Sequence, residues 1–288
     1  MTEPEVQVLP LNGVELALQG YGDPADPAIL LIGGASTSMD FWPPELCQRI
    51  AAAGRYVVRY DFRDTGQSTT YGAGGATYTP ADLVADAIAI LDHLQLPKAH
   101  LVGMSMGGVL AQLAAVTYPD RVSTLTLIAT TLALPGAVER DLPEMSAADQ
   151  EAFAALPPPD WSDPSSTVDY LLEQERLCAA RSVPFDAVQM RALVQTTIAR
   201  TRDPQAMENH FDLGSTPPGS ERITDIAAPT LVVHGDEDPV FPLAHAEALA
   251  EEIPGAQLKI ISALGHEMPP RIWDELVAAV VLHTTPPD

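Results

Sequence analysis

Lysine is scarce in this sequence. Lys98 and Lys259 are the only two among 288 residues, and Lys and Arg together number 15 against 39 Asp and Glu, which gives a formal net charge of −24. A field of this sign repels nucleic-acid phosphates and anionic lipid head groups. We therefore expect neither nucleic acid nor a membrane as a partner. With so few lysines, the sequence also offers almost no candidate for chemistry through a Schiff base.

Cysteines and long apolar runs are also rare. Cys47 and Cys178 are far apart and lack metal-ligand spacing, so we expect two free thiols in a reducing compartment and no metal site. No apolar run approaches the roughly 20 residues that a membrane-spanning helix needs. The N-terminal MTEPEVQVLP is acidic and lacks the apolar region of a secretory signal. These absences favour a cytoplasmic protein.

The first half of the chain alternates between strand and helix patterns. Continuous apolar runs such as AILLI are typical of buried strands, whereas residues 80–94 carry apolar side chains near helical spacing. An Asn12-Gly13 turn joins the first two strand patterns. The alternation predicts an α/β fold with a mostly parallel sheet flanked by helices on both faces. The predicted strands are 6–10, 14–20, 28–32, 55–60, 98–103 and 123–129, and the predicted helices are 42–53, 80–94 and 107–118.

The character of the sequence changes at about Pro135. No strand pattern follows until APTLVVHG at 228–235, and the helical segments 144–156, 166–182 and 185–202 are separated by prolines, which end helices. We predict a helical cap over residues 135–222, inserted after the sixth strand into a core made of 1–134 and 223–288. The alternation then resumes with a helix at 243–253, a strand at 257–262 and a final helix at 270–283.

One serine stands in the glycine-rich stretch LVGMSMGG (101–108). Gly103 and Gly107 lie two residues either side of Ser105, at a predicted junction of strand and helix. A side chain can project from such a sharp turn only if its neighbours are small, and the start of the next helix directs N–H groups and a partial positive charge at the same space. We interpret Ser105 as a nucleophile. The alternative is a glycine-rich connection with an idle serine.

A serine nucleophile needs a base, and seven histidines are candidates. His266 differs from the rest because it lies in the loop ALGHEMPP, directly after a predicted strand and therefore at the carboxyl edge of the sheet. His234 ends a strand, which favours a buried packing role. The other five are expected at the surface or in packing: His93, His100, His210, His245 and His283.

The acid of a catalytic triad should come from another loop at the same edge. The segment HGDEDPVFP follows a strand and offers Asp236, Glu237 and Asp238, whereas the strand before the predicted cap is followed by no acid until Glu139. The chain order is then serine, acid, histidine. This order is that of the α/β-hydrolase arrangement and not of the other serine enzymes.

The motifs Gly103-x-Ser105-x-Gly107 and His234-Gly-x-x-Asp238 resemble those of the α/β-hydrolases, and the similarity extends over essentially the whole chain. Within that superfamily, the segments DPADPAILLIGGAS, RYDFRDTGQSTT and VGMSMGG resemble the aclacinomycin methylesterase type of carboxylic ester hydrolase. The resemblance implies Asp238 as the acid. It also implies an oxyanion hole made of the Met106 and Ala35 N–H groups, with Gly34 as the rival second donor.

The resemblance further implies a serine esterase that needs no metal and no organic cofactor, and that hydrolyses small to medium hydrophobic esters through an acyl-enzyme. Small and apolar residues of core and cap are candidates to line its pocket, and their character would favour hydrophobic or aromatic small-molecule esters. They are Gly34, Met39, Phe41, Trp42, Met104 and Met268 in the core, and Phe153, Trp161, Met190 and Phe211 in the cap.

Other functions share these motifs. Cofactor-free haloperoxidases, lactonases and carbon–carbon hydrolases use the same three residue types, and a non-catalytic ligand-binding protein on this scaffold is a further alternative. The loop RDTGQST is expected to be structural, anchored through Arg63 and Asp64. The sequence leaves open the acyl group, the alcohol, the oligomeric state and the position of the cap.

Overall fold

The structure is a computed structural model that describes residues 3–214 and 220–285. Its centre is an eight-stranded sheet in the order β1-β2-β4-β3-β5-β6-β7-β8. The first two strands pair antiparallel, β2 also pairs antiparallel with β4, and all other pairs are parallel. The strands are β1 (Gln7–Leu11), β2 (Val14–Tyr21), β3 (Ala28–Ile32), β4 (Tyr56–Tyr60), β5 (Ala99–Met104), β6 (Val122–Ile128), β7 (Thr230–Gly235) and β8 (Gln257–Ile261).

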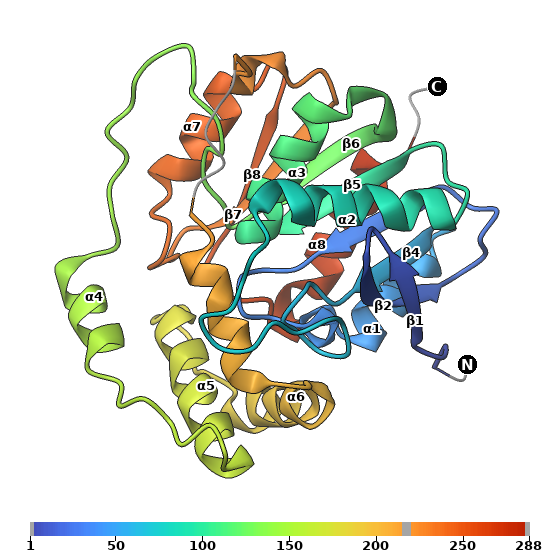
Figure 1. Ribbon diagram of the computed structural model, residues 1–288. Coiled ribbons are helices and arrows are strands. Elements are labelled where there is room, and N and C mark those ends of the chain that lie inside the picture. Colours follow the sequence, from blue (N-terminus) through green and yellow to red (C-terminus); the bar gives the residue numbers. More distant parts are fainter. Residues whose placement is uncertain (1–2, 215–219, 286–288) are drawn as a thin grey trace.

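Helices cover both faces of this sheet (Figure 1). One core contains the apolar sides of α2 (Pro80–His93), α3 (Met106–Thr117) and α7 (Ala244–Glu252). The other contains those of α1 (Pro44–Ala51) and α8 (Trp273–His283). The prediction of an α/β fold with a mostly parallel sheet flanked by helices on both faces is therefore confirmed. Single turns of 3-10 helix are η1 (Met39–Phe41), η2 (Pro119–Arg121), η4 (Ile223–Asp225) and η5 (Pro270–Ile272).

Local chemistry explains several element boundaries. Asn12 and Gly13 both have positive φ, of 48° and 77°, as the tight hairpin between β1 and β2 requires. A capping box between Thr79 and Asp82 begins α2, with Pro80 in its first turn. The helix predicted from residue 42 begins at Pro44, because the Pro44 ring disfavours the helical conformation at the residue before it, and Pro43 is extended with ψ of 147°.

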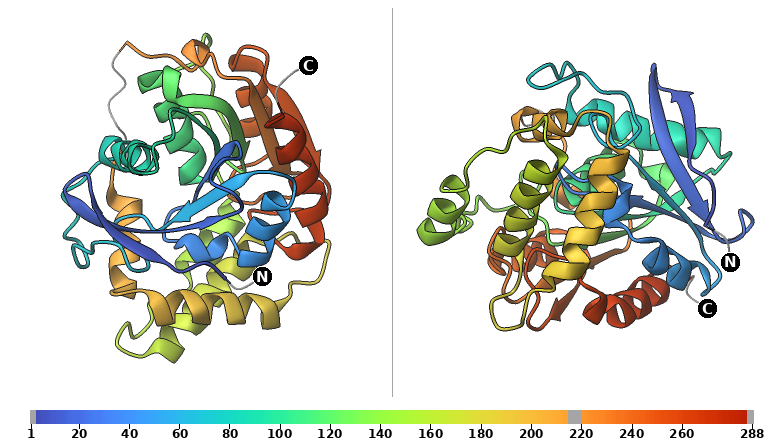
Figure 2. Two further views of the ribbon diagram at one scale, coloured as in Figure 1. Left: turned by 90° about the vertical axis from the view of Figure 1, so that its right-hand side faces the viewer. Right: turned by 90° about the horizontal axis from the view of Figure 1, so that it is seen from below.

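Between β6 and β7 the described chain contains helices and no strand (Figure 2). These are α4 (Ala147–Ala154), α5 (Pro164–Cys178), α6 (Ala187–Arg200), the 3-10 segment η3 (Pro204–Asp212) and, last, the single turn η4. The Ile223 N–H donates to the Pro135 carbonyl at 3.1 Å, so the chain leaves and re-enters the core at one place. We propose on this basis that residues 135–222 form a cap on a core of 1–134 and 223–288. Residues 215–219 of this range lie outside the described residues.

A buried ion pair fastens the cap to the core. Arg200, the last residue of α6, donates to both carboxylate oxygens of Asp61, at 2.9 and 2.6 Å, and to Asp40 at 3.0 Å. Asp61 follows β4 and is fully buried. Burial raises the pKa of the Asp61 carboxyl, and the Arg200 guanidinium acts against that rise. No helix in the described ranges is long and apolar enough to cross a membrane.

Replacing Arg200 by methionine should therefore destabilise the fold. Breaking one partner of a buried pair leaves an uncompensated charge, and we expect the free energy of unfolding to fall by about 3 kcal/mol in denaturant titrations. Arg191→Met is the matched control, since Arg191 lies on the same helix and pairs with Asp169 at an exposed position. Equal stabilities of the two variants would contradict this role of Arg200.

Candidate active site

Ser105 occupies a strained turn between β5 and α3. Its backbone has φ of 53° and ψ of −120°, which a residue with a side chain rarely adopts. A Cβ on Gly103 would overlap the Gly107 carbonyl, and a Cβ on Gly107 would overlap the Ile32 and Gly33 carbonyls. Only glycine fits at either place. The turn is further held by the Ser105 N–H, which donates to the Ile128 carbonyl at 3.0 Å.

Three backbone N–H groups beside Ser105 are candidate oxyanion donors. Within residues 3–214 and 220–285, the N–H groups of Gly34, Ala35 and Met106 donate to no protein acceptor. A Cβ built on Gly34 would lie 3.5 Å from the Ser105 Cβ, so the loop after β3 passes close to the serine. Met106 is the first residue of α3, where the helix dipole places partial positive charge. The geometry leaves both Gly34 and Ala35 as possible second donors.

The candidate acid and base are hydrogen bonded to each other. Asp238 Oδ2 lies 2.9 Å from His266 Nδ1, and since a carboxylate only accepts, Nδ1 carries the proton. Asp238 Oδ1 accepts from the N–H groups of Val240 and Phe241 at 2.8 and 2.9 Å. Burial alone would raise the pKa of the Asp238 carboxyl, but the His266 ring and these donors hold it below the usual value. His266 Nε2 is thereby left as an acceptor.

The other acids of the β7 loop have different contacts. Asp236 is exposed and accepts from the Ala263 N–H at 2.7 Å. Glu237 accepts from the N–H groups of Arg181 and Ser182, at 2.9 and 3.0 Å, in the connection between α5 and α6. Of the three acids, Asp238 is the one that contacts His266.

Five of the remaining histidines have the packing or surface roles expected. His234 is fully buried, and its Nε2 lies 2.7 Å from the Phe241 carbonyl. His100, His245 and His283 each contact backbone carbonyls or a threonine hydroxyl, and His93 is exposed.

His210 has a role that the sequence did not reveal. Its Nδ1 accepts from the Ser36 N–H at 3.0 Å, and its Nε2 lies 2.8 Å from the Arg63 carbonyl. Burial lowers the pKa of the ring, which favours the neutral form that these two bonds require. Ser36 has a positive φ of 56° and directly follows Ala35, so a cap residue fixes the candidate oxyanion loop. The flanking Asn209 also binds the core, donating to Asp64 at 2.9 Å.

The cap holds the histidine loop as well. The His266 N–H donates to the Cys178 carbonyl, at the end of α5, over 2.7 Å. Glu267 accepts from the Ala180 N–H at 3.2 Å. A Cβ on Gly265 would overlap this same stretch of backbone, so a glycine precedes His266 for steric reasons. Cap and histidine loop therefore form one packed unit.

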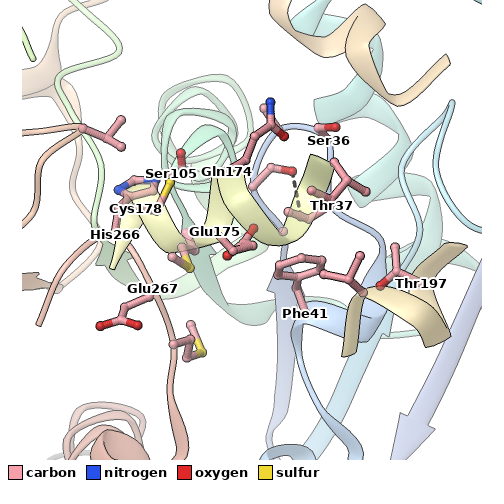
Figure 3. Close-up of a pocket in the computed structure, with 18 of the residues that line it drawn as sticks. Ser36, Thr37, Phe41, Ser105, Gln174, Glu175, Cys178, Thr197, His266 and Glu267 are labelled. Atoms are coloured by element: carbon pink, nitrogen blue, oxygen red, sulfur yellow. Dashed lines mark hydrogen bonds between the residues drawn. The ribbon is translucent and has the colours of Figure 1, made fainter. Parts of the chain in front are cut away.

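Ser105 and His266 line a cavity of about 530 Å³ between core and cap (Figure 3). Of the residues predicted to bind substrate, eight line this cavity: Gly34, Phe41, Trp42, Met104, Met268, Phe153, Met190 and Phe211. Ala35 lines it too. Apolar side chains make up much of the wall.

Two predicted pocket residues lie elsewhere. Met39 is buried in η1, where its N–H donates to Asp61 at 2.9 Å, and its side chain packs in the core instead of lining the cavity. Trp161 packs edge-on against Tyr170, with ring centroids 5.8 Å apart, within the cap itself. The prediction that either lines the pocket was wrong, because large apolar side chains serve packing equally well.

The loop RDTGQST contacts other parts of the core. Arg63 forms two hydrogen bonds to Asp86 of α2, at 2.7 and 2.8 Å, and Asp64 accepts from Tyr78 at 2.8 Å. These bonds fit a structural role.

Among the described residues, no group of three or more His, Cys, Asp or Glu side chains is placed to hold a metal ion.

Comparison with known proteins agrees with this architecture. The alpha/beta hydrolase fold family matches residues 27–269. The rhodomycin D methylesterases of Streptomyces sp. (strain C5) and Streptomyces peucetius are each 36% identical over 94% of this chain and 95% of their own. The crystal structure of a hydrolase from Pseudomonas aeruginosa PA01 superposes with a TM-score of 0.72 and 25% identity, over 98% of this chain and 99% of that one. The chain therefore belongs to the α/β-hydrolase family, as a carboxylic ester hydrolase similar to the methylesterases.

Proposed function

We propose that the chain is a serine-dependent methylesterase acting through Ser105, His266 and Asp238. The observation that carries the proposal is the 2.9 Å contact between Asp238 and His266, on the wall of a cavity that Ser105 also lines. The contact leaves the His266 Nε2 lone pair available as a base. The similarity to methylesterases over 94% of the chain supports methyl as the alcohol portion.

In the proposed reaction, His266 Nε2 takes the Ser105 proton while the serine oxygen attacks the ester carbonyl. The Met106 N–H and the Ala35 N–H, with Gly34 as the alternative, stabilise the oxyanion. His266 then gives its proton to the departing alcohol, and water repeats the attack on the acyl-enzyme. Asp238 orients the imidazole and stabilises its cation. No metal and no organic cofactor enters these steps.

We infer a hydrophobic acid portion for the substrate. The cavity of about 530 Å³ is large enough for a molecule of drug size, and Phe41, Trp42 and Phe153 offer apolar contact. The two free cysteines suit a reducing compartment, so we propose the cytoplasm as the location.

Ser105→Ala and His266→Ala should each lower the turnover of methyl and 4-nitrophenyl esters by about three orders of magnitude or more, because triad members act as one unit. Steady-state kinetics on a panel of rising acyl size gives the measurement. Wild-type cleavage of lactones or carbon–carbon substrates in preference to every ester would instead favour a lactonase or carbon–carbon hydrolase. Halogenation would favour a haloperoxidase, and binding without turnover a ligand-binding protein.

Asp238→Asn should lower kcat far more than Asp236→Asn. The neutral amide at 238 can hold the imidazole in the wrong tautomer, whereas Asp236 binds the Ala263 N–H away from His266. Parallel measurement of kcat for the two variants tests the assignment. A larger loss in Asp236→Asn would move the acid two residues along the loop.

His210→Leu should lower kcat by about tenfold or more with a smaller change in KM. Without the bonds to Ser36 and Arg63, the loop that carries Ala35 loses its anchor, and oxyanion donors act mainly in the transition state. His93→Leu, at an exposed site, is the matched control. Measurements at a temperature where both variants are folded separate this effect from instability, and an unchanged kcat would refute the positioning role.

A further inference from the structure

One face of α5 lines the cavity. Leu171, Gln174, Glu175 and Cys178 follow one another at spacings of three, one and three residues, which places them on a single side of the helix. Glu173 does not line the cavity and is exposed. Figure 3 draws Glu175 on the wall with His266 and Phe41. A carboxyl group is thus directed into a largely apolar space beside the proposed base.

The cavity has an unbalanced charge. Its described wall contains three carboxyl groups, those of Glu175, Glu208 and Glu267, while His266 is the only basic side chain among the lining residues. The whole chain carries a formal net charge of −24. With Glu267 paired to Arg271, the carboxylates of Glu175 and Glu208 still leave the cleft with an excess of negative charge, which favours cations and disfavours anions.

Two of these carboxyl groups have partners. Glu208 accepts from the Ser36 hydroxyl at 3.3 Å. Glu267 accepts from the Ala180 N–H at 3.2 Å and pairs with Arg271 at 2.6 Å. Glu175, by contrast, forms no hydrogen bond or ion pair with any residue in 3–214 or 220–285.

An unpaired carboxyl group in this place is costly to the free protein. Burial raises the pKa of Glu175 to about 7, with His266 acting against the rise and Glu267 adding to it. A leucine or methionine, as found elsewhere on the wall, would fill the position without the cost of desolvating a charge. Titratable groups perturbed in this way within a cleft are typical of functional sites.

We propose that Glu175 is a specificity residue that binds a positively charged group on the acid portion of the substrate, so that the preferred esters are cationic. This inference rests on the proposed ester hydrolysis. The cation supplies the partner that Glu175 lacks, while the surrounding apolar side chains contact the rest of the acid portion.

The test uses pairs of esters that differ only in charge. The 4-nitrophenyl esters of 6-(trimethylammonio)hexanoate and 7,7-dimethyloctanoate have the same shape, and 4-(trimethylammonio)butanoate and 5,5-dimethylhexanoate form a shorter pair. We expect the wild type at pH 8 to favour the cationic member of at least one pair by about tenfold or more in kcat/KM, as a charged contact in a partly buried site provides. Glu175→Gln should remove this preference and leave kcat/KM of the neutral ester within about threefold.

The ratio of cationic to neutral kcat/KM should also rise between pH 6 and pH 8 in the wild type, because Glu175 becomes a carboxylate through this range, and stay flat in Glu175→Gln. The other titratable groups on this wall are His266, Glu267, Cys178 and Glu208. The trimethylammonium charge does not titrate, and both esters need the same state of His266, so the protonation of the base cancels in the ratio. Glu173→Gln, on the same helix, controls for the change in net charge and should retain the preference.

Three outcomes would overturn the proposal. They are no preference for either cationic ester, a preference that survives Glu175→Gln, or an equal loss of kcat/KM on charged and neutral esters in Glu175→Gln, which would mean that Glu175 acts through His266.

Ser105→Ala separates a failure of this inference from a failure of the proposed function. If Ser105→Ala still hydrolyses the esters, the proposed function fails. If Ser105→Ala is inactive yet binds the cationic ester more tightly than its neutral twin in calorimetry, and Glu175→Gln in that background removes the difference, the inference stands.

Discussion

The left-handed backbone of Ser105 is the constraint on which the rest of the site depends. It is possible only because α3 begins in direct contact with the ends of β3 and β5, where side chains at 103 and 107 would overlap backbone atoms. Gly108 continues the contact, since a Cβ there would meet the Thr130 side chain after β6. Because β5 lies between β3 and β6, this close approach brings the loop of Gly34 and Ala35 beside the serine. The Met106 N–H, the first of α3, also lies beside the serine, so one tight junction supplies both the Ser105 hydroxyl and its candidate oxyanion donors.

The cap is a structural part of this site as well as its cover. It contacts the loop after β3 through His210, the loop after β7 through Arg181 and Ser182, and the histidine loop through Cys178. Arg200 adds a buried ion pair to the end of β4. These bonds hold loops that line the cavity, so movement of the cap would displace the very loops that carry the proposed catalytic groups. Chemistry and specificity are therefore coupled here, and they cannot be assigned separately to core and cap.

The sequence predicted the features that depend on local signals. Apolar runs and helical spacing identified every strand and every α-helix of the described core, but not its single turns of 3-10 helix, and the glycines around Ser105 marked the sharp turn. His266 could be selected because it follows a strand, which fixes the edge of the sheet that it reaches, whereas the same argument left three acids open and only the resemblance to the α/β-hydrolases favoured Asp238. His210, Glu175, Met39 and Trp161 were missed or misassigned because their roles depend on how the cap packs on the core. For Glu175, the sequence of α5 did contain a signal. The face of this helix that turns inward carries polar groups, Gln174 and Glu175, between Leu171 and Cys178.

The charge of the cavity explains why backbone N–H groups suit the proposed oxyanion site. The Asp238 carboxylate, hydrogen bonded to His266 at 2.9 Å, stabilises the imidazolium that develops during the proposed serine attack, and Glu175 on the cavity wall adds negative charge. The same carboxylates disfavour an oxyanion in this cavity, so its stabilisation has to come from donors at very short range. The N–H groups at the start of α3 and in the loop after β3 meet this requirement, since they are fixed in direction and add no mobile charge that would neutralise Glu175. An arginine or lysine in their place would also stabilise the oxyanion. It would, however, pair with the carboxylates, and the cavity would then lose its excess of negative charge.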